Sequence, residues 1–399
     1  MDKFSNVQKE DLNITCIDCG IDFLFTVGEQ IYFERKNLYL PKRCKTCRKN
    51  KKDRKTQIEN KKWREQENRK IKILLEQLNY NNLVNSELSS LNPRETLYVI
   101  GNGFDIMHGV SSRYSDFRDS MGKSNTLRWQ LETYIKSDSL WSDFEEALAH
   151  INGSAILGTV DMWLDSFNAY DEDAQSADFF AAIDIATSPA TEIVQTLPIR
   201  FRKWVETLKP TKEAFLLDVF RPESKYLNFN YTEFLETIYH IPSQAITYIH
   251  GCRTSKKHEL ILGHAPDASE FDDWTPTLSI PNYKSNQKAY MINSALDVAS
   301  RTLIEYDEAT TKDTRTIIKN HCSFFSNLTD IKNIVVIGHS LSVVDYPYFK
   351  EIITKNNNTA NWFISWHSSR DLENITAFAQ SMNILNSQIN LITLNFKNA

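Results

Sequence analysis

The sequence lacks any long apolar run. No stretch of its 399 residues approaches the roughly 18 consecutive apolar side chains that a membrane-spanning helix needs. The first residues, MDKFSNVQKEDLN, are polar and lack the apolar core of a signal peptide. Both absences argue against a membrane protein, and we therefore expect a cytoplasmic protein.

Glycine, proline and cysteine are also scarce, at 11, 11 and 6 residues. So few cysteines in a chain of this length exclude a disulfide-rich secreted scaffold. The composition, 41% hydrophobic and 24% charged, is that of an ordinary globular protein. The length is sufficient for a large core and favours more than one domain.

The few cysteines are concentrated near the N-terminus. CIDC and CKTC place Cys16, Cys19, Cys44 and Cys47 in two CxxC pairs that 24 residues separate. Two such pairs can bring four thiolates together around one Zn²⁺. A disulfide is disfavoured in the cytosol, and a redox CxxC needs a βαβ context that is absent here. We therefore predict a structural zinc site.

The two cysteine pairs assign residues 1–48 to a zinc ribbon, and the stretch between them resembles a zinc-ribbon domain of small bacterial proteins. Such ribbons bind nucleic acid, bind protein or cap a fold. Its short runs FLFTV and IYF have strand character. A segment this small needs the metal for much of its folding free energy. We expect its aromatic residues to form a miniature core rather than a surface for stacking bases; these are Phe23, Phe25, Tyr32 and Phe33.

A basic segment follows the cysteines. Residues 42–72 contain 15 Lys and Arg against 4 Asp and Glu, whereas the formal net charge of the whole chain is −5. Residues 49–78 are expected to form one long charged helix within a linker at 49–92. This segment favours contact with a nucleic acid or a phage component, and a solvated linker helix is the alternative.

Residues 93–399 alternate short apolar runs with helical patterns, which predicts an α/β fold with a doubly wound, mostly parallel, Rossmann-like sheet. Large helical insertions are expected near 119–221 and 266–328, either as a lid over a cleft or as filling around the core. The expected strands are Thr96–Ile100, Tyr226–Phe229, Ile246–Ile249, Asn333–Ile337, Trp362–Trp366 and Ile389–Leu394.

Four of these strands end in polar or glycine residues. Ligands of open parallel sheets bind beyond the carboxyl ends of the strands, so we expect one pocket there. The first end, GNGFD, has the form of a phosphate-binding loop, although glycines also make tight turns. The strand-end candidates are Gly101, Asn102, Gly103, Asp105, Asn228, Asn230, His250, Gly338, His339, Ser340 and Asp345.

In this order, GNGFD, WSDFEEAL, LNFNYTEFLE, IHG, LILGH and GHSLSVVDYPYF resemble the AbiH family of bacterial phage abortive-infection proteins, from Leu97 to the C-terminus. The same segments are similar to sirtuin-type NAD-binding domains. Gly101, Gly103, Gly109, Val110, Phe117 and Arg118 match their glycine-rich loop, and Gly338, Ser340 and Leu341 match a late loop that touches adenosine.

This resemblance implies an effector of phage defence that binds and hydrolyses NAD or a related nucleotide. Asn230 matches the catalytic asparagine and His250 the general-base histidine. Asn102 and the amides of Gly101 and Gly103 would hold the diphosphate, with Arg118 as the charge partner. We also expect a homo-oligomer.

The sequence departs from the sirtuin pattern at Asn102, Asp105, Thr232 and His339. Asp105 would bring a carboxylate near the phosphates unless it faces the ribose or the sheet. The four-cysteine module that follows HG in sirtuin deacetylases is missing, since only Cys252 and Cys322 lie downstream. NAD hydrolysis is therefore the nearer analogy than removal of acyl groups from lysine.

Two other functions stay open. One is a metal-dependent nuclease that gathers Asp105, Asp345 and His250 around a metal ion; the other is a non-catalytic nucleotide-binding switch. Structural roles compete as well, since Asp105 could cap a helix. Glu145 and Glu146 are expected on an exposed helix face, although one acidic group there could reach the cleft. The GHSLS segment does not have the spacing of a serine-hydrolase elbow.

Overall fold

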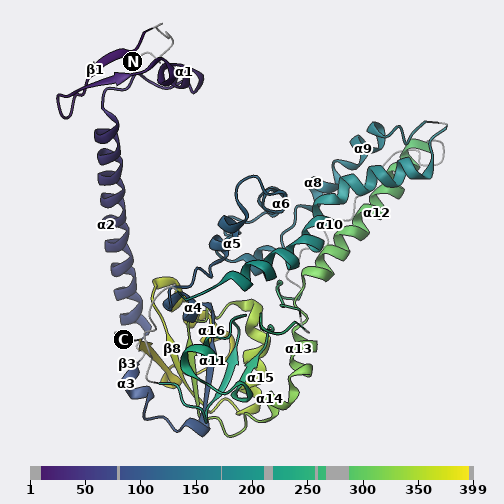
Figure 1. The fold of residues 1–399 in the computed structure, drawn as a ribbon. Helices are drawn as coiled ribbons and strands as arrows, with labels where there is room; N and C mark the ends of the chain where they lie inside the picture. The colour runs from purple at the N-terminus through teal and green to yellow at the C-terminus, as the bar shows by residue number, and fades with distance from the viewer. Residues whose placement is uncertain are drawn as a thin grey trace. The chain divides into compact units, whose positions relative to one another are not determined.

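The computed structural model describes residues 10–78, 81–171, 173–210, 219–256, 259–266 and 287–394 (Figure 1). The chain divides into two compact units, residues 1–76 and 77–399. None of the helices in the described ranges is long and apolar enough to cross a membrane.

The N-terminal unit begins with a two-stranded antiparallel hairpin of β1 (Leu12–Thr15) and β2 (Asp22–Phe25). Helix α1 (Val27–Arg35) follows at once, because Thr26 and Glu29 form a reciprocal capping box at its first turn. The strand character expected for IYF was therefore wrong, since these residues lie within α1. Local capping outweighs the β propensity of a three-residue run.

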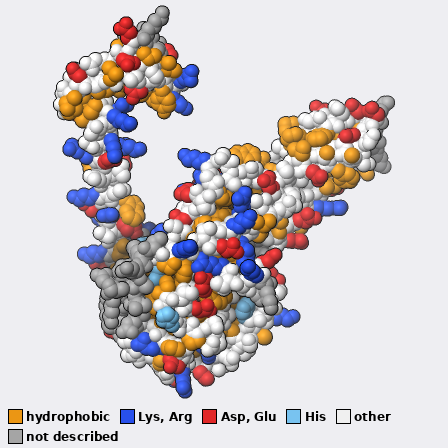
Figure 2. Space-filling model, in the orientation of Figure 1, with side chains coloured by type: hydrophobic (Ala, Val, Ile, Leu, Met, Phe, Trp, Pro, Cys, Tyr) orange, Lys and Arg blue, Asp and Glu red, His pale blue; other side chains and the backbone are white. Residues whose placement is uncertain are grey.

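Helix α2 (Lys45–Leu78) has 34 residues and none of them is buried. Lysines and arginines line it along its length (Figure 2). Three lysines of its middle and end form i,i+4 ion pairs with glutamates, which support a solvated helix: Lys55–Glu59, Lys61–Glu65 and Lys72–Glu76. The predicted boundary after residue 48 lies inside this helix.

The larger unit is built on a parallel seven-stranded sheet with the order β3-β9-β8-β7-β4-β5-β6. If β3 is left out and the other six strands are renumbered 1 to 6 in chain order, the sheet read from its β6 edge has the order 3-2-1-4-5-6. This is the strand order of doubly wound dinucleotide-binding folds. The strands are β3 (Asn81–Val84), β4 (Thr96–Ile100), β5 (Lys225–Asn228), β6 (Ile246–Tyr248), β7 (Asn333–Ile337), β8 (Asn361–Ser365) and β9 (Ile389–Thr393).

All six expected strands are present, and the predicted α/β class is confirmed. Strand β4 is buried along its whole length, as its apolar sequence TLYVI requires at the centre of a covered sheet. Its last residue, Ile100, is in register with Asn228 of β5 and Ile337 of β7. The loops after β4, β5 and β7 therefore leave the sheet at one edge. The edge strand β3 was missed, because NNLV has little apolar character.

Crossover helices cover the sheet. Helices α15 and α16 share one face, where the rings of Phe349, Trp362 and Phe378 pack together. The helices of this core are α3 (Asn85–Leu88), α4 (Asn102–Met107), α11 (Phe234–Tyr239), α13 (Thr314–Asn320), α14 (Cys322–Ser326), α15 (Tyr346–Lys355) and α16 (Ser369–Ser381).

The two insertions form a helical arm (Figure 1). Helices α10 and α12 lie side by side, and α8 and α9 pack on both. Apolar side chains such as Leu164, Ile183 and Leu296 give the arm its own core. The helices of the insertions are α5 (Tyr114–Met121), α6 (Thr126–Tyr134), α7 (Phe144–Ala147), α8 (Gly153–Leu157), α9 (Val160–Ser166), α10 (Ser176–Thr207) and α12 (Gln287–Thr310).

Candidate functional site

A cavity of about 1720 Å³ opens at the edge of the sheet where β4, β5 and β7 end. The change of winding direction lies between β4 and β7, which is where doubly wound sheets bind their ligands. Of the twelve residues predicted for the site, Asn228 alone is not in the cavity lining. Its side chain instead shapes the turn after β5, since Oδ1 accepts from the Asn230 amide.

Gly101, Gly103 and Gly338 allow the loops after β4 and β7 to pack closely against each other. The amide of Gly101 donates to Ile337 O at 3.0 Å, and that of Gly103 donates to Gly338 O at 2.7 Å. A Cβ at Gly103 would lie 2.7 Å from the Gly338 Cα, so no larger residue fits. The prediction that these two amides grip a diphosphate was therefore wrong, because the loop after β7 already occupies them.

Asp105 is buried and links the first loop to the second. Its carboxylate accepts from Asn230 Nδ2 at 2.8 Å and from Thr232 Oγ1 at 2.7 Å. Burial raises the pKa of Asp105 to about 7, although the hydrogen bonds from Thr232 and Asn230 oppose the rise. Asp105 does not cap α4, whose N-cap is Gly101. Thr232, one of the departures noted in the sequence, thus serves as a donor to Asp105.

A buried lysine lies behind two acidic residues of the cavity lining, Glu145 and Asp345, and is the centre of their charged network. Lys312, which follows α12, has no exposed side-chain surface and donates to Glu145 Oε2 at 2.6 Å and to Asp345 Oδ1 at 3.3 Å. Burial alone would lower the pKa of Lys312, but Asp345 and Glu145 outweigh it and raise that pKa. Burial likewise opposes the charge on Asp345, yet Lys312 and the neighbouring histidines hold its pKa well below the usual value.

Glu145 is held from three sides. Besides Lys312, the hydroxyl of Tyr114 donates to Oε1 at 2.9 Å and that of Tyr231 lies 3.5 Å away. Burial, followed by the charge of Glu145, raises the pKa of both tyrosines well above the usual value. The structure favours the alternative for Glu145, which reaches the cavity, over an exposed helix face, because α7 is a single turn rather than a long amphipathic helix.

Two histidines flank Asp345. Nε2 of His250 lies 3.7 Å from Asp345 Oδ1 and 3.3 Å from the Tyr348 hydroxyl. Nδ1 of His339 accepts the Leu341 amide at 2.9 Å, which leaves Nε2, 3.5 Å from Asp345 Oδ2, to carry the proton. Burial, reinforced by Lys312, lowers the pKa of His250 well below the usual value, so this ring is neutral at physiological pH.

The cavity lining has more acidic than basic side chains. Eight Asp and Glu residues and three Arg residues line the cavity. Arg118 pairs with Asp119 at 2.8 Å and Arg370 pairs with Asp143 at 2.6 Å. Among the described residues, Arg113 forms no ion pair, so it is the cation of the lining that remains for an anionic ligand.

Sequence reasoning did not find Lys312. No motif surrounds it, and its position depends on backbone pairing between the ends of two distant segments. The His264 amide donates to Thr310 O at 2.9 Å, and the Lys312 amide donates to His264 O at 2.8 Å. His264 is itself buried, with Nε2 3.3 Å from Asp307, and supports this pairing from outside the cavity lining.

The four N-terminal cysteines form the metal centre. Their Sγ atoms all lie within 4.8 Å of one another, and Cys19 and Cys44 are 3.9 Å apart at sulfur. Tetrahedral Zn²⁺ with Zn–S bonds of about 2.3 Å requires sulfur atoms about 3.8 Å apart, so the residues fit this ion. Across the described residues, no other cluster of Cys, His, Asp and Glu meets this criterion.

Comparison with known protein families supports the division of the chain into an N-terminal cysteine unit and a larger α/β unit. A model described as "Bacteriophage abortive infection AbiH" matches residues 97–366, about two thirds of the chain. The chain belongs to the AbiH family. A second model, described as a probable treble clef domain, matches residues 10–56 and, with the cysteine geometry, supports a structural zinc site. Neither the curated proteins nor the solved structures gave a match.

The AbiH match covers the strands from β4 to β8, and with them the polar network around Lys312. Membership of the AbiH family assigns the protein to phage abortive infection. The treble-clef match refines the expected ribbon, because Cys44 and Cys47 lie at the start of a long helix, α2, rather than in a second hairpin.

Proposed function

We propose that this AbiH protein is an abortive-infection effector that binds NAD or a related nucleotide in the cavity and hydrolyses the bond between nicotinamide and ribose. One observation carries the proposal: Asn230, His250 and Asp345 converge on a carboxylate-rich cavity at the change of winding direction of the sheet. Its volume exceeds the roughly 300–1,000 Å³ of ordinary small-molecule sites, which suits a dinucleotide.

The electrostatics of the cavity suit this reaction. The nicotinamide ring of NAD is cationic, and positive charge develops on the ribose as the C–N bond breaks. A lining with more carboxylates than arginines stabilises that charge in the transition state. Since the amides of Gly101 and Gly103 are occupied, Arg113 is the group that would contact the diphosphate, and Arg118 would do so only by exchanging its ion pair with Asp119.

Hydrolysis converts NAD and water into ADP-ribose and nicotinamide, with one C–N bond broken and one C–O bond formed. His250 is neutral and would take a proton from the attacking water. Asp345, 3.7 Å from its Nε2, would stabilise the imidazolium that forms. Because Nδ2 of Asn230 is bound to Asp105, Oδ1 is the atom that would orient the water or a ribose hydroxyl.

A non-catalytic nucleotide switch is the second candidate. It is favoured by the bonds of Asn230 and Thr232 to Asp105, which give these residues a structural role without any ligand. The nuclease alternative is less favoured, because two of its three expected ligands are already engaged: Asp105 accepts from Asn230 and Thr232, and Asp345 pairs with the Lys312 ammonium.

Mass spectrometry of nucleotides in cells tests the proposal. Cells that make the active protein should lose NAD and gain ADP-ribose and nicotinamide. Asn230→Ala and His250→Ala should prevent this change, whereas the exposed His150→Ala serves as a matched control that should not. NAD loss that is unchanged in both variants would overturn the catalytic roles. Nucleotide binding by the purified protein without turnover would identify a switch.

We further propose that the treble-clef unit and the basic part of α2 contact the infection trigger, a nucleic acid or a phage component. The support is the concentration of positive charge in residues 42–72 of a chain that is acidic overall. We also propose that the protein acts as a homo-oligomer, which size-exclusion chromatography with light scattering would detect.

A further inference from the structure

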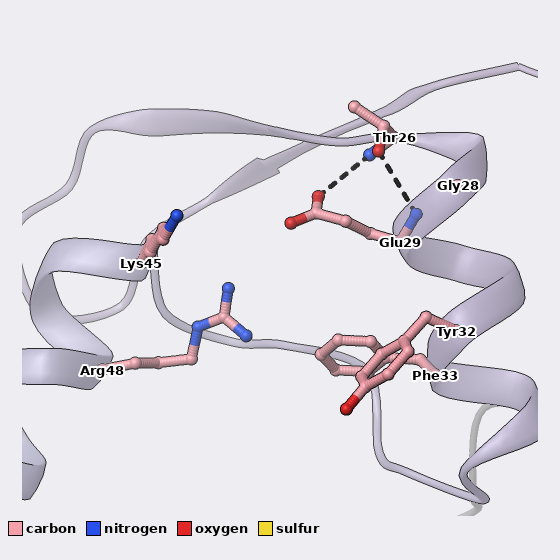
Figure 3. A pocket seen from close by; sticks show the side chains of 7 residues that line it. All are labelled: Thr26, Gly28, Glu29, Tyr32, Phe33, Lys45 and Arg48. Carbon is pink, nitrogen blue, oxygen red and sulfur yellow. Dashed lines mark hydrogen bonds between the residues drawn. The ribbon is translucent and has the colours of Figure 1, made fainter.

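A notch in the N-terminal unit lies between α1 and the start of α2 and has a volume of about 610 Å³. Figure 3 shows Arg48 reaching from α2 toward Tyr32 and Phe33 on α1, with Lys45 on the α2 side of the notch. All these elements belong to residues 1–76, which form one compact unit. The notch thus combines cations and aromatic rings on one small surface.

The aromatic wall of the notch is accessible. Tyr32 is 56% exposed, whereas Phe25 is 1% exposed and forms the core of the unit with Phe33. Tyr32 was therefore wrongly assigned to the miniature core. An exposed tyrosine beside two cations is the arrangement that single-stranded nucleic-acid sites use to stack unpaired bases.

The cations of the notch are not neutralised. Arg48 lies over the Phe33 ring at 5.9 Å, and its Nε atom is buried without a hydrogen-bond partner. The only carboxylate in the lining, Glu29, accepts from the Thr26 amide at 3.3 Å in the capping box. An anion in the notch would meet Lys45 and Arg48 with little competition from this carboxylate.

A basic stripe continues from the notch along α2. Lys45, Arg48 and Lys52 are three and four residues apart, so they share one helix face. Flanked by Lys49 and Lys51, they form no ion pair within the described part of the chain. Lysines farther along α2, such as Lys61, do pair with glutamate. Unpaired positive charge is therefore concentrated at the end of α2 that carries the notch.

We propose that this notch and stripe form a binding site for single-stranded nucleic acid, with a base stacked on Tyr32 and phosphates against Lys45, Arg48 and Lys52. A folded duplex offers no unpaired base to the notch and would use only the charges. The inference rests on the proposed role of the N-terminal unit in sensing the trigger, and it gives that trigger a chemical class.

Fluorescence anisotropy of the zinc-loaded full-length protein with a labelled single-stranded 20-mer tests this site. Tyr32→Ala should weaken binding roughly five- to hundredfold. The double variant Lys45→Ala/Arg48→Ala should reduce the slope of log K against log salt by about 1.4, since each phosphate contact to a single strand contributes about 0.7. Zinc content and circular dichroism confirm that each variant is folded.

Matched controls lie outside the proposed site. Tyr39→Ala removes another tyrosine of similar exposure outside the notch, and Lys332→Ala/Lys355→Ala removes two ion-paired lysines of the larger unit. Both should leave binding unchanged. Equal losses in the controls, tighter binding of a duplex, or preferential binding to anionic vesicles would overturn the inference. NAD consumption is measured separately, so failure of the cavity proposal and failure of this site are distinguishable.

Discussion

Nζ of Lys312 lies 2.6 Å from Oε2 of Glu145, and this ion pair joins the two insertions of the AbiH domain directly at the cavity. Glu145 comes from α7 in the first insertion, and Lys312 follows α12 in the second. The same ammonium is 3.3 Å from Asp345, in the loop after β7. The buried ammonium of Lys312 thus links the two insertions to the loop after β7 of the sheet.

We predict that Lys312→Met destabilises the protein by about 3–5 kcal/mol, because it leaves two carboxylates buried without their cation. Urea denaturation of the larger unit measures the effect. Lys332→Met, which breaks the surface pair with Glu95, is the control and should cost far less. A similar loss of unfolding free energy in both variants would mean that the buried ion pair stabilises the protein no more than the surface pair does.

The raised pKa of Asp105 predicts a pH dependence. Its folded pKa, about 7, exceeds the usual 3.8, so the protonated carboxyl favours the folded state. This contribution is complete below about pH 4 and is lost as the pH rises to about 7, on the order of 4 kcal/mol in total. The difference in unfolding free energy between the parent and Asp105→Asn should change over that range. A constant difference from pH 4 to pH 7 would contradict the assigned pKa.

Gly338 should tolerate no side chain. Its φ is +64°, and a Cβ would collide with the backbone of Gly103 and Phe104. We predict that Gly338→Ala costs more than the roughly 1–2 kcal/mol of the left-handed conformation alone. Gly122→Ala is a control for backbone strain without collision, because Gly122 has a φ of +74° and open space around its Cβ position. Thermal denaturation of both variants should show how much of the destabilisation comes from the steric collision at Gly338 and how much from the backbone conformation.

Zinc should be bound at one ion per chain. Replacement of Cys16, Cys19, Cys44 or Cys47 by Ser should abolish it, since each sulfur is one of four ligands. Elemental analysis of the purified protein measures the metal. Cys252→Ser and Cys322→Ser should retain it fully, and loss of zinc in these controls would place the metal elsewhere.

Local signals identified the strands and the metal ligands. Continuous apolar runs such as TLYVI have no stable alternative to a covered strand, and two CxxC pairs carry their function in their spacing. The strand-end residues were also predictable, because the C-terminal ends of parallel strands share one edge. Lys312 could not be predicted, since its role depends on pairing between residues far apart in the sequence.

The sequence by itself determined the α/β class, the AbiH resemblance and the cysteine site, since each depends on residues close together in the chain. The tertiary structure decided what the polar residues do. It occupied the amides of Gly101 and Gly103, bound Asn230 to Asp105 and buried Lys312 between two carboxylates. Burial and long-range contacts decide whether a side chain is charged and which of its hydrogen-bonding atoms remain free. Neither property is encoded in the residues next to it in the sequence.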